Sequence, residues 1–192
     1  MDGMSEIHST AIIYPGVRIE ENVRIGPYCV IGGPPEHREF YDGKKAQGVI
    51  IKAGARIFSH VTIDAGTNKP TIIGKNVAIF NHSHVGHDCY LDHDCIIGGS
   101  VSLAGHCHVM PFANISGKSC LSQQTIVGAY AFLGGASYLT RDLPIGERWV
   151  GQPPRYMGEN IVGLGRAGID YDVALLEYGE IFQELKRERD AR

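Results

Sequence analysis

Histidines gather in one short part of the sequence. Six of the nine lie between residues 82 and 108: His82, His84, His87, His93, His106 and His108. A neutral imidazole, with an ordinary pKa of about 6.5, can take a proton from a hydroxyl group at physiological pH. Gly105 also lies in this stretch, and a glycine lets its backbone N–H approach a developing oxyanion without a side chain in the way. This combination suits transfer of an acyl group from a thioester to an alcohol, with His87 as general base and Gly105 as oxyanion donor. Nothing in the chain requires a metal ion or a covalent intermediate.

The elements that must position these groups follow a period of six. An aliphatic residue recurs without a break at Ile73, Ile79, Val85, Leu91, Ile97, Leu103, Val109, Ile115, Leu121, Val127, Leu133 and Leu139. Four residues after these come compact side chains: Val77, Ser83, Cys89, Cys95, Val101, Cys107, Ala113, Ser119, Thr125, Ala131 and Ser137. This period fits neither the helical 3.6 nor the strand period of 2. It predicts short flat sides joined by turns.

The same spacing occupies the amino-terminal part of the chain, at Ile7, Ile13, Ile19, Ile25, Ile31, Ile51, Ile57 and Ile63. Residues 33–50 and 64–72 break it and contain Gly, Pro and charged side chains. We therefore predict that both segments are loops thrown out of the repeat.

Three hexads would form one triangular coil, so residues 18 apart would stack and pair in parallel. His87 would then lie above Gly105 and Gln123, Asp88 above His106 and Gln124, and His84 above Ser102. The aliphatic and compact positions face the axis in this arrangement. Four of the five cysteines fall on compact inward positions, and only Cys120 does not. They are expected to be free thiols that fill the core.

With these patterns the sequence resembles the left-handed parallel β-helix acyltransferases, a resemblance that alone supplies the handedness. NHSHVGHDC (81–89) and SLAGHCHV (102–109) are similar to motifs of the UDP-N-acetylglucosamine O-acyltransferases of lipid A biosynthesis. The resemblance implies that His87 is the base, that Asp88 orients or polarises it, and that Gly105 donates to the oxyanion.

The same resemblance implies a set of substrate-binding residues. His84 and His106 match histidines that contact substrate, and Gln123 matches a glutamine near the acyl donor. NIVGLGRAG (160–168) resembles a segment that contacts nucleotide, which makes Asn160 and Arg166 candidates. Asp64 begins DAGT, where the family has His-Arg-Gly-Thr, and we include it among the substrate-binding candidates.

Charge and composition limit the partners. The formal net charge of −3 argues against electrostatic capture of nucleic acid, and no apolar stretch approaches the length of a membrane span. We expect a cytoplasmic protein without a cofactor. The resemblance implies acyl carrier protein, or acyl-coenzyme A, as donor of a (3-hydroxy)fatty acyl group. It also implies a nucleotide sugar as acceptor and a homotrimer with active sites between subunits.

The predicted organisation is an all-β molecule with a short helical end. Residues 1–144 form the β-helix, and residues 145–192 form an extension with one helix around 171–188. Asp170 or Asp172 caps this helix. Its apolar stripe, Ala174, Tyr178, Ile181 and Leu185, packs on the β-helix or on a neighbouring subunit.

Three alternatives remain open from the sequence. TIDAGTNKPTIIG (62–74) also looks like a segment of the glucosamine N-acyltransferases, so an amino-sugar nucleotide and an acetyl group are possible substrates. A γ-type carbonic anhydrase would bind zinc through three histidines, and His82 and His87 could be two of them. The third would have to lie two coils before His82, where Ala46 stands. A non-catalytic trimeric scaffold is the third alternative, and loss of activity in His87→Ala would exclude it.

Overall fold

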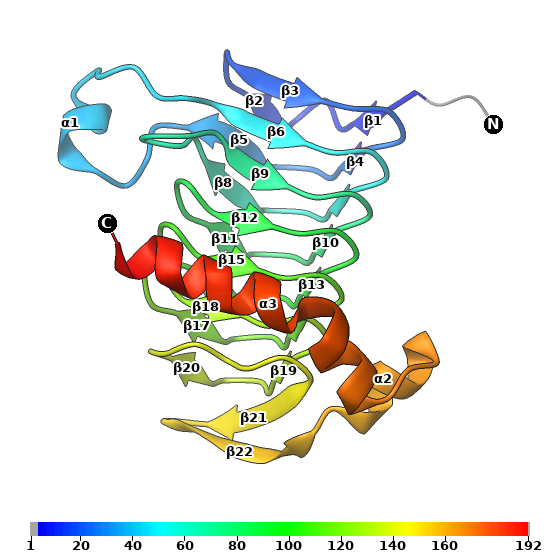
Figure 1. Ribbon diagram of the computed structural model, residues 1–192. Coiled ribbons are helices and arrows are strands. Elements are labelled where there is room, and N and C mark those ends of the chain that lie inside the picture. The colour runs from blue at the N-terminus through cyan, green and yellow to red at the C-terminus, as the bar shows by residue number, and fades with distance from the viewer. Residues whose placement is uncertain (1–3, 192) are drawn as a thin grey trace.

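The computed structural model describes residues 4–191 and has the predicted architecture of a parallel β-helix (Figure 1). Its coils are built from short strands joined by turns, and residues 18 apart pair in register, as His84 with Ser102 and Tyr90 with His108. The strands stack into three sheets, which we call sheets A, B and C.

The strands of each sheet follow in spatial order. Sheet A contains β1 (Glu6–Ile7), β4 (Arg24–Ile25), β7 (Arg56–Ile57), β10 (Ala78–Ile79), β13 (Ile96–Ile97), β16 (Asn114–Ile115), β19 (Phe132–Leu133), β21 (Glu147–Gly151) and β22 (Pro154–Glu159). Sheet B contains β2 (Ile12–Ile13), β5 (Val30–Gly33), β8 (Thr62–Asp64), β11 (His84–Val85), β14 (Ser102–Leu103), β17 (Cys120–Leu121) and β20 (Tyr138–Leu139). Sheet C contains β3 (Val17–Ile19), β6 (Val49–Ile51), β9 (Thr71–Ile73), β12 (Tyr90–Leu91), β15 (His108–Val109) and β18 (Ile126–Val127).

The core fills the inside of the coils. The aliphatic and compact positions of the repeat from residue 73 to 139 are all buried, and Cys29, Cys89, Cys95 and Cys107 are buried with them. Cys120 is exposed, as its place outside the repeat predicted. Ile7 departs from the prediction, because its coil is the first of the described residues and 44% of the residue is exposed.

Tight corners join the sheets and place polar residues at fixed positions. One residue of most corners has a positive φ, including His82 at 62°, Asp88 at 58° and His106 at 64°. Asp, Asn and His tolerate this left-handed conformation better than most side chains. Polar residues therefore recur along the corners of the coils.

Both predicted loops leave the coil at the corner between sheets B and C. Residues 34–48 connect β5 to β6 and include a short helix, α1 (Arg38–Tyr41), while residues 65–70 connect β8 to β9. The turns that contain His87 and Gly105 lie at the same corner in the next two coils. The loops and the histidine cluster consequently share one edge of the molecule.

The carboxyl-terminal extension contains more elements than the single helix that the sequence predicted. β21 continues sheet A in parallel with β19, β22 folds back antiparallel to it, and α2 (Ile161–Ala167) precedes α3 (Tyr171–Asp190). Figure 1 shows α3 crossing sheet C near β15 and β18. The Asp170 side chain caps α3 by accepting a hydrogen bond from the Val173 N–H at 2.9 Å.

The apolar face of α3 was predicted correctly except at one position. Ala174 is buried in a cluster that includes Met110, Ile126 and Tyr130, and Tyr178 and Leu185 pack against this cluster. Ile181 is 48% exposed, and Phe182 is buried in its place. The two residues are one position apart, so the helix is rotated slightly from the predicted orientation. Within residues 4–191, no helix is long and apolar enough to cross a membrane.

Candidate active site

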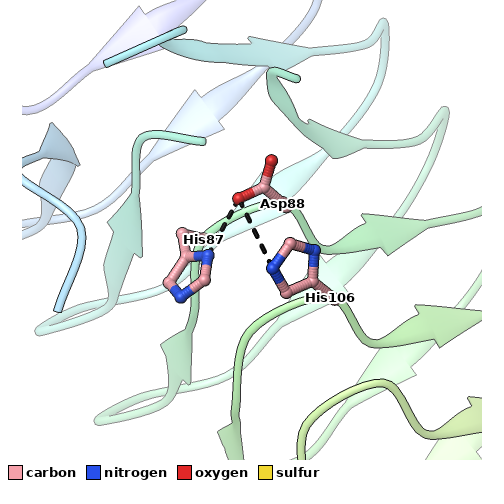
Figure 2. A group of neighbouring side chains, drawn as sticks. All are labelled: His87, Asp88 and His106. Carbon is pink, nitrogen blue, oxygen red and sulfur yellow. Dashed lines mark hydrogen bonds and ion pairs between the residues drawn. The ribbon is translucent and has the colours of Figure 1, made fainter. Parts of the chain in front are cut away.

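His87 and Asp88 form a hydrogen-bonded pair at the corner between sheets B and C (Figure 2). His87 Nδ1 lies 2.8 Å from Asp88 Oδ2, and 12% of the His87 side chain is exposed. Because Nδ1 faces the carboxylate, Nε2 is the ring nitrogen left for a reacting group. This is the arrangement in which a carboxylate fixes the tautomer and direction of a general base.

The Asp88 carboxylate is buried and surrounded by donors. Its side chain has no exposed surface, and it accepts hydrogen bonds from the Thr67 N–H and hydroxyl and from the Asn68 and Lys69 N–H groups, at 2.7–2.9 Å. Burial alone raises the pKa of Asp88, but the hydrogen bonds outweigh it, the Lys69 N–H foremost, and hold the pKa well below its usual range. The carboxylate beside His87 is therefore ionised throughout the physiological range.

Gly105 lies directly against the His87 ring in the next coil. A Cβ at this position would approach His87 Cε1 to 2.6 Å and Nε2 to 2.7 Å, so only glycine leaves the ring in place. Within residues 4–191, the Gly105 N–H donates to no protein acceptor, whereas the next N–H, of His106, donates to the His87 carbonyl at 2.9 Å. An available backbone donor thus accompanies the base.

His106 completes the group on the side of Asp88. Its ring stands perpendicular to that of His87, with 4.9 Å between centroids, and its Nε2 lies 4.0 Å from Asp88 Oδ2. His106 lines a cavity of about 60 Å³ together with Leu185 and Arg189 of α3. The carboxyl-terminal helix therefore covers the sheet C side of the site.

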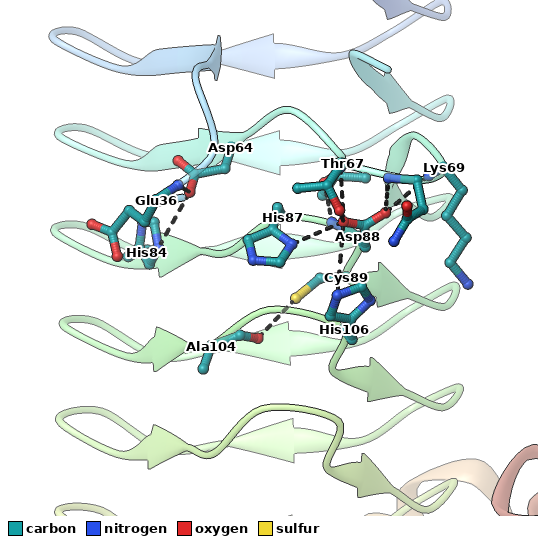
Figure 3. Close-up of polar contacts among 12 residues, drawn as sticks. Glu36, Asp64, Thr67, Lys69, His84, His87, Asp88, Cys89, Ala104 and His106 are labelled. Atoms are coloured by element: carbon teal, nitrogen blue, oxygen red, sulfur yellow. Dashed lines mark hydrogen bonds and ion pairs between the residues drawn. The ribbon is translucent and has the colours of Figure 1, made fainter. Parts of the chain in front are cut away.

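His84 occupies a second, acidic part of the edge (Figure 3). Its Nδ1 lies 2.8 Å from the Thr62 hydroxyl, and its Nε2 lies 3.9 Å from Asp64 Oδ2 and 4.0 Å from Glu36 Oε2. Asp64 also accepts a hydrogen bond from the Glu36 N–H at 3.1 Å. Burial raises the pKa of Asp64, while His84 opposes this rise.

Gln123 is exposed one coil below Gly105. It lines a cavity of about 640 Å³ on the sheet B side, together with Ser102, Ala104 and Tyr138. The structure therefore brings His84, His87, Asp88, Gly105, His106, Asp64 and Gln123 to one edge.

Asn160 and Arg166 lie at a different corner, between sheets C and A. They line a cavity of about 480 Å³ with Asp94, Phe112 and Arg148. The Asn160 side chain donates to the Tyr130 carbonyl at 2.8 Å and accepts from the Gly163 N–H at 3.2 Å, so it caps α2. Arg166 is exposed. A single chain does not bring these two residues to His87.

Comparison with known proteins shows which proteins this chain is similar to. The family model for bacterial transferase hexapeptide (six repeats) matches residues 4–33. The acyl-(acyl-carrier-protein)–UDP-N-acetylglucosamine O-acyltransferase of Burkholderia orbicola is 29% identical over 88% of this chain and 79% of its own length. The enzyme of that name from Rhizobium johnstonii is 35% identical over 86% of this chain and 61% of its own length. A UDP-N-acetylglucosamine acyltransferase from Bacteroides fragilis matches in structure with a TM-score of 0.83 at 28% identity, over 98% of this chain and 78% of that one.

The chain is thus similar over most of its length to UDP-N-acetylglucosamine O-acyltransferases, and part of it matches the hexapeptide repeat of bacterial transferases. These relatives and this solved structure identify it as an acyltransferase.

A metal ion fits poorly in this acyltransferase site. His87, Asp88 and His106 offer ligand atoms within 4.8 Å of one another. However, the four donors from Thr67, Asn68 and Lys69, with His87, already occupy the lone-pair directions of the carboxylate. An ion would have to displace several of these hydrogen bonds.

Sequence reasoning did not identify Thr62, Glu36 or Thr67 as part of the site. The signal for Thr67 was present, because the loop at 64–72 interrupts the repeat one coil before His87. Its contacts with Asp88 depend on the conformation of the loop, which no spacing in the sequence predicts.

A second His–Asp pair shows what distinguishes the first. His93 Nδ1 lies 2.9 Å from Asp94 Oδ2 at the next corner, but 42% of the His93 side chain and 36% of the Asp94 side chain are exposed. The next coil places Phe112 edge-on against His93, as His106 stands against His87, but at the position of Gly105 it has Pro111, which has no N–H to donate. The pair at 93 and 94 therefore lacks both burial and a backbone donor.

Proposed function

We propose that the protein transfers a (3-hydroxy)fatty acyl group from acyl carrier protein to a hydroxyl group of a UDP-N-acetylglucosamine-like nucleotide sugar. The observation that carries this proposal is the buried His87–Asp88 pair with the uncommitted Gly105 N–H beside it. The names of the Burkholderia and Rhizobium relatives support the donor and acceptor classes.

His87 acts as general base at Nε2. It takes the hydroxyl proton while the acceptor oxygen forms a bond to the thioester carbonyl carbon. The Gly105 N–H donates to the oxyanion of the tetrahedral intermediate. The C–S bond then breaks, and the imidazolium returns its proton to the leaving thiolate, so no covalent enzyme intermediate forms. Asp88 keeps the Nδ1 proton in place and stabilises the imidazolium.

The surrounding residues divide between the two substrates. The acceptor sugar is contacted by the residues that flank the His87–Asp88 pair: His84, Asp64 and His106. The cavity beside Gln123 receives the acyl donor, since Ala104, which adjoins Gly105, and Gln123, one coil below it, both line this cavity. Acyl-coenzyme A is the alternative donor, and the reaction takes place in the cytoplasm.

Asn160 and Arg166 contribute to the site from a neighbouring subunit of a homotrimer. Their position at another corner of the same chain supports this assignment, because a threefold assembly brings different corners of two subunits together. Arg166 contacts the nucleotide diphosphate, and Asn160 shapes the segment that carries it.

The primary test is mass spectrometry of products. Purified protein is incubated with UDP-N-acetylglucosamine and a pool of 3-hydroxyacyl carrier proteins, with His87→Ala in parallel. We expect an acylated nucleotide sugar from the wild type and a rate lower by about 10²- to 10⁴-fold in the variant. Product only from an amino-sugar nucleotide or only from acyl-coenzyme A would replace the proposed acceptor or donor. Equal product from both proteins would contradict the role of His87.

Subunit mixing tests the shared site. His87→Ala and Arg166→Ala, each inactive alone, are unfolded and refolded together in equal amounts. Random trimers should recover about a quarter of wild-type activity, because one interface in four pairs two intact halves. No recovery from trimers shown to be mixed would place both residues in a site within one subunit.

A further inference from the structure

We propose that Thr67 is a positioning residue for the His87–Asp88 pair, and that the loop 65–70 belongs to the catalytic machinery. This inference rests on the proposed function, in which His87 is the base. The loop leaves the coil after β8 and returns at β9, one coil before the dyad and at the same corner.

Thr67 controls the carboxylate oxygen that faces the base. Its N–H and its hydroxyl donate to Asp88 Oδ2 at 2.8 and 2.7 Å, and the same oxygen lies 2.8 Å from His87 Nδ1. The other oxygen, Oδ1, accepts from the Asn68 and Lys69 N–H groups at 2.9 Å each. With both oxygens held, the carboxylate cannot turn about its last side-chain bond, a rotation that is otherwise loosely restrained.

The backbone conformation of the loop makes this set of donors possible. Three consecutive N–H groups converge on one carboxylate, as in anion-binding turns. Gly66 permits the turn, since a Cβ there would overlap the Lys69 carbonyl oxygen. On the other side, the buried Thr71 hydroxyl accepts the Asp88 N–H at 2.9 Å, which fixes the backbone under the carboxylate.

The pair at His93 and Asp94 supplies an internal comparison. It has the same sequence and nearly the same Nδ1–Oδ2 distance, but no loop precedes it at its corner. Asp94 also accepts a hydrogen bond from Asn76 Nδ2 at 3.1 Å. The side chains of His93 and Asp94 are both far more exposed than those of His87 and Asp88. The repeat alone thus produces an exposed His–Asp pair, whereas the inserted loop buries the pair and restrains its carboxylate by hydrogen bonds.

The test compares Thr67→Val with Thr67→Ser. Valine keeps the shape and the backbone N–H but removes the hydroxyl donor, so kcat should fall by roughly 10- to 100-fold with KM for both substrates little changed. Serine restores the hydroxyl and should recover most of kcat. Thr125→Val is the matched control, because it removes a buried threonine hydroxyl that donates to the Ser122 carbonyl at 2.6 Å and touches neither His87 nor Asp88.

Proton NMR provides a readout that does not depend on substrate. The Nδ1–H resonance of His87, identified by its loss in His87→Ala, should shift and broaden in Thr67→Val and return in Thr67→Ser. An unchanged resonance in Thr67→Val would overturn the inference. A fall in kcat that serine does not rescue would do so as well. If the wild type acylates none of the offered acceptors, the NMR result still decides the role of Thr67, so the two proposals fail separately.

Discussion

Substituting Gly105 by alanine tests the site at its tightest contact. A Cβ on residue 105 would lie 2.6 Å from His87 Cε1, and ordinary van der Waals contact begins at 3.4 Å. The ring must therefore retreat by the difference, 3.4 − 2.6 = 0.8 Å. The backbone of Gly105 has no positive φ, so alanine fits its conformation and the coil should still fold.

The expected loss follows from this displacement. His87 is tied to Asp88 Oδ2 at 2.8 Å, so the ring cannot move by 0.8 Å without lengthening that bond or tilting Nε2 away from the acceptor. A misplacement of about 1 Å in a catalytic group costs about 100-fold in rate, which corresponds to about 2.7 kcal/mol of transition-state stabilisation. The methyl group also narrows the approach to the Gly105 N–H. Both effects should lower kcat.

The assay is steady-state acyl transfer with the donor and acceptor found by mass spectrometry, alongside thermal unfolding. Gly99→Ala is the matched control, because Gly99 holds the same hexad position one corner earlier and a Cβ there would meet only the Asn81 carbonyl oxygen at 3.4 Å. We expect Gly99→Ala to retain wild-type kcat and Gly105→Ala to lose about two orders of magnitude, with similar melting temperatures. Near wild-type kcat in a folded Gly105→Ala protein would refute the placement of His87 at the reacting atoms.

Three further predictions concern stability and reactivity. The pKa of the Asp88 carboxyl is lowered in the folded state, so its ionised form stabilises the fold. This stabilisation is complete above the unfolded pKa of about 3.9 and is lost as the pH falls toward the lower folded pKa. Urea unfolding should show the loss of stability below about pH 4 in the wild type and not in Asp88→Asn. Burial raises the pKa of the Cys29, Cys89 and Cys95 thiols, whereas Cys120 is exposed; iodoacetamide should label one thiol in the native protein and five after unfolding. Phe182→Ala should destabilise the packing of α3 on the β-helix by about 3–5 kcal/mol, and hydrogen exchange should become faster in α3 with little change in the coils. Leu176→Ala, at an 86% exposed position, should leave hydrogen exchange in α3 nearly unchanged. Equal exchange rates in the two variants would show that the packing of α3 does not depend on Phe182.

The sequence predicts most of the fold because the repeat is unusually regular. A period of six, with an aliphatic and a compact residue in each hexad, determined the inward positions, the 18-residue stacking and the contact between His87 and Gly105. The errors occur where the repeat ends. Among residues 4–191, no coil covers Ile7. The hairpin β21–β22 and helix α2 follow no period, since their positions depend on packing against the last coils.

The candidate site could be predicted only in part. Residues of the unbroken repeat after residue 73 were placed together correctly, because stacking fixes their neighbours, whereas Thr62 lies before the second loop and its contact with His84 was missed. Glu36 and Thr67 were missed too, because they belong to loops whose conformations are set by local hydrogen bonds. Asn160 and Arg166 lie at another corner of the chain, so their proposed relation to His87 rests on an assembly that no spacing within one chain specifies.

The repeated His-Asp-Cys sequence shows why the departures from the repeat matter. It occurs at residues 87–89 and again at 93–95, and in both places the histidine bonds the aspartate through Nδ1. Only the first pair has an inserted loop on one side and a glycine in the next coil on the other. Regular stacking supplies rigid corners, and a break in the pattern supplies the buried carboxylate and the open N–H. In a β-helix of this kind, the place to look for chemistry is therefore the corner at which an insertion, a glycine and a histidine meet.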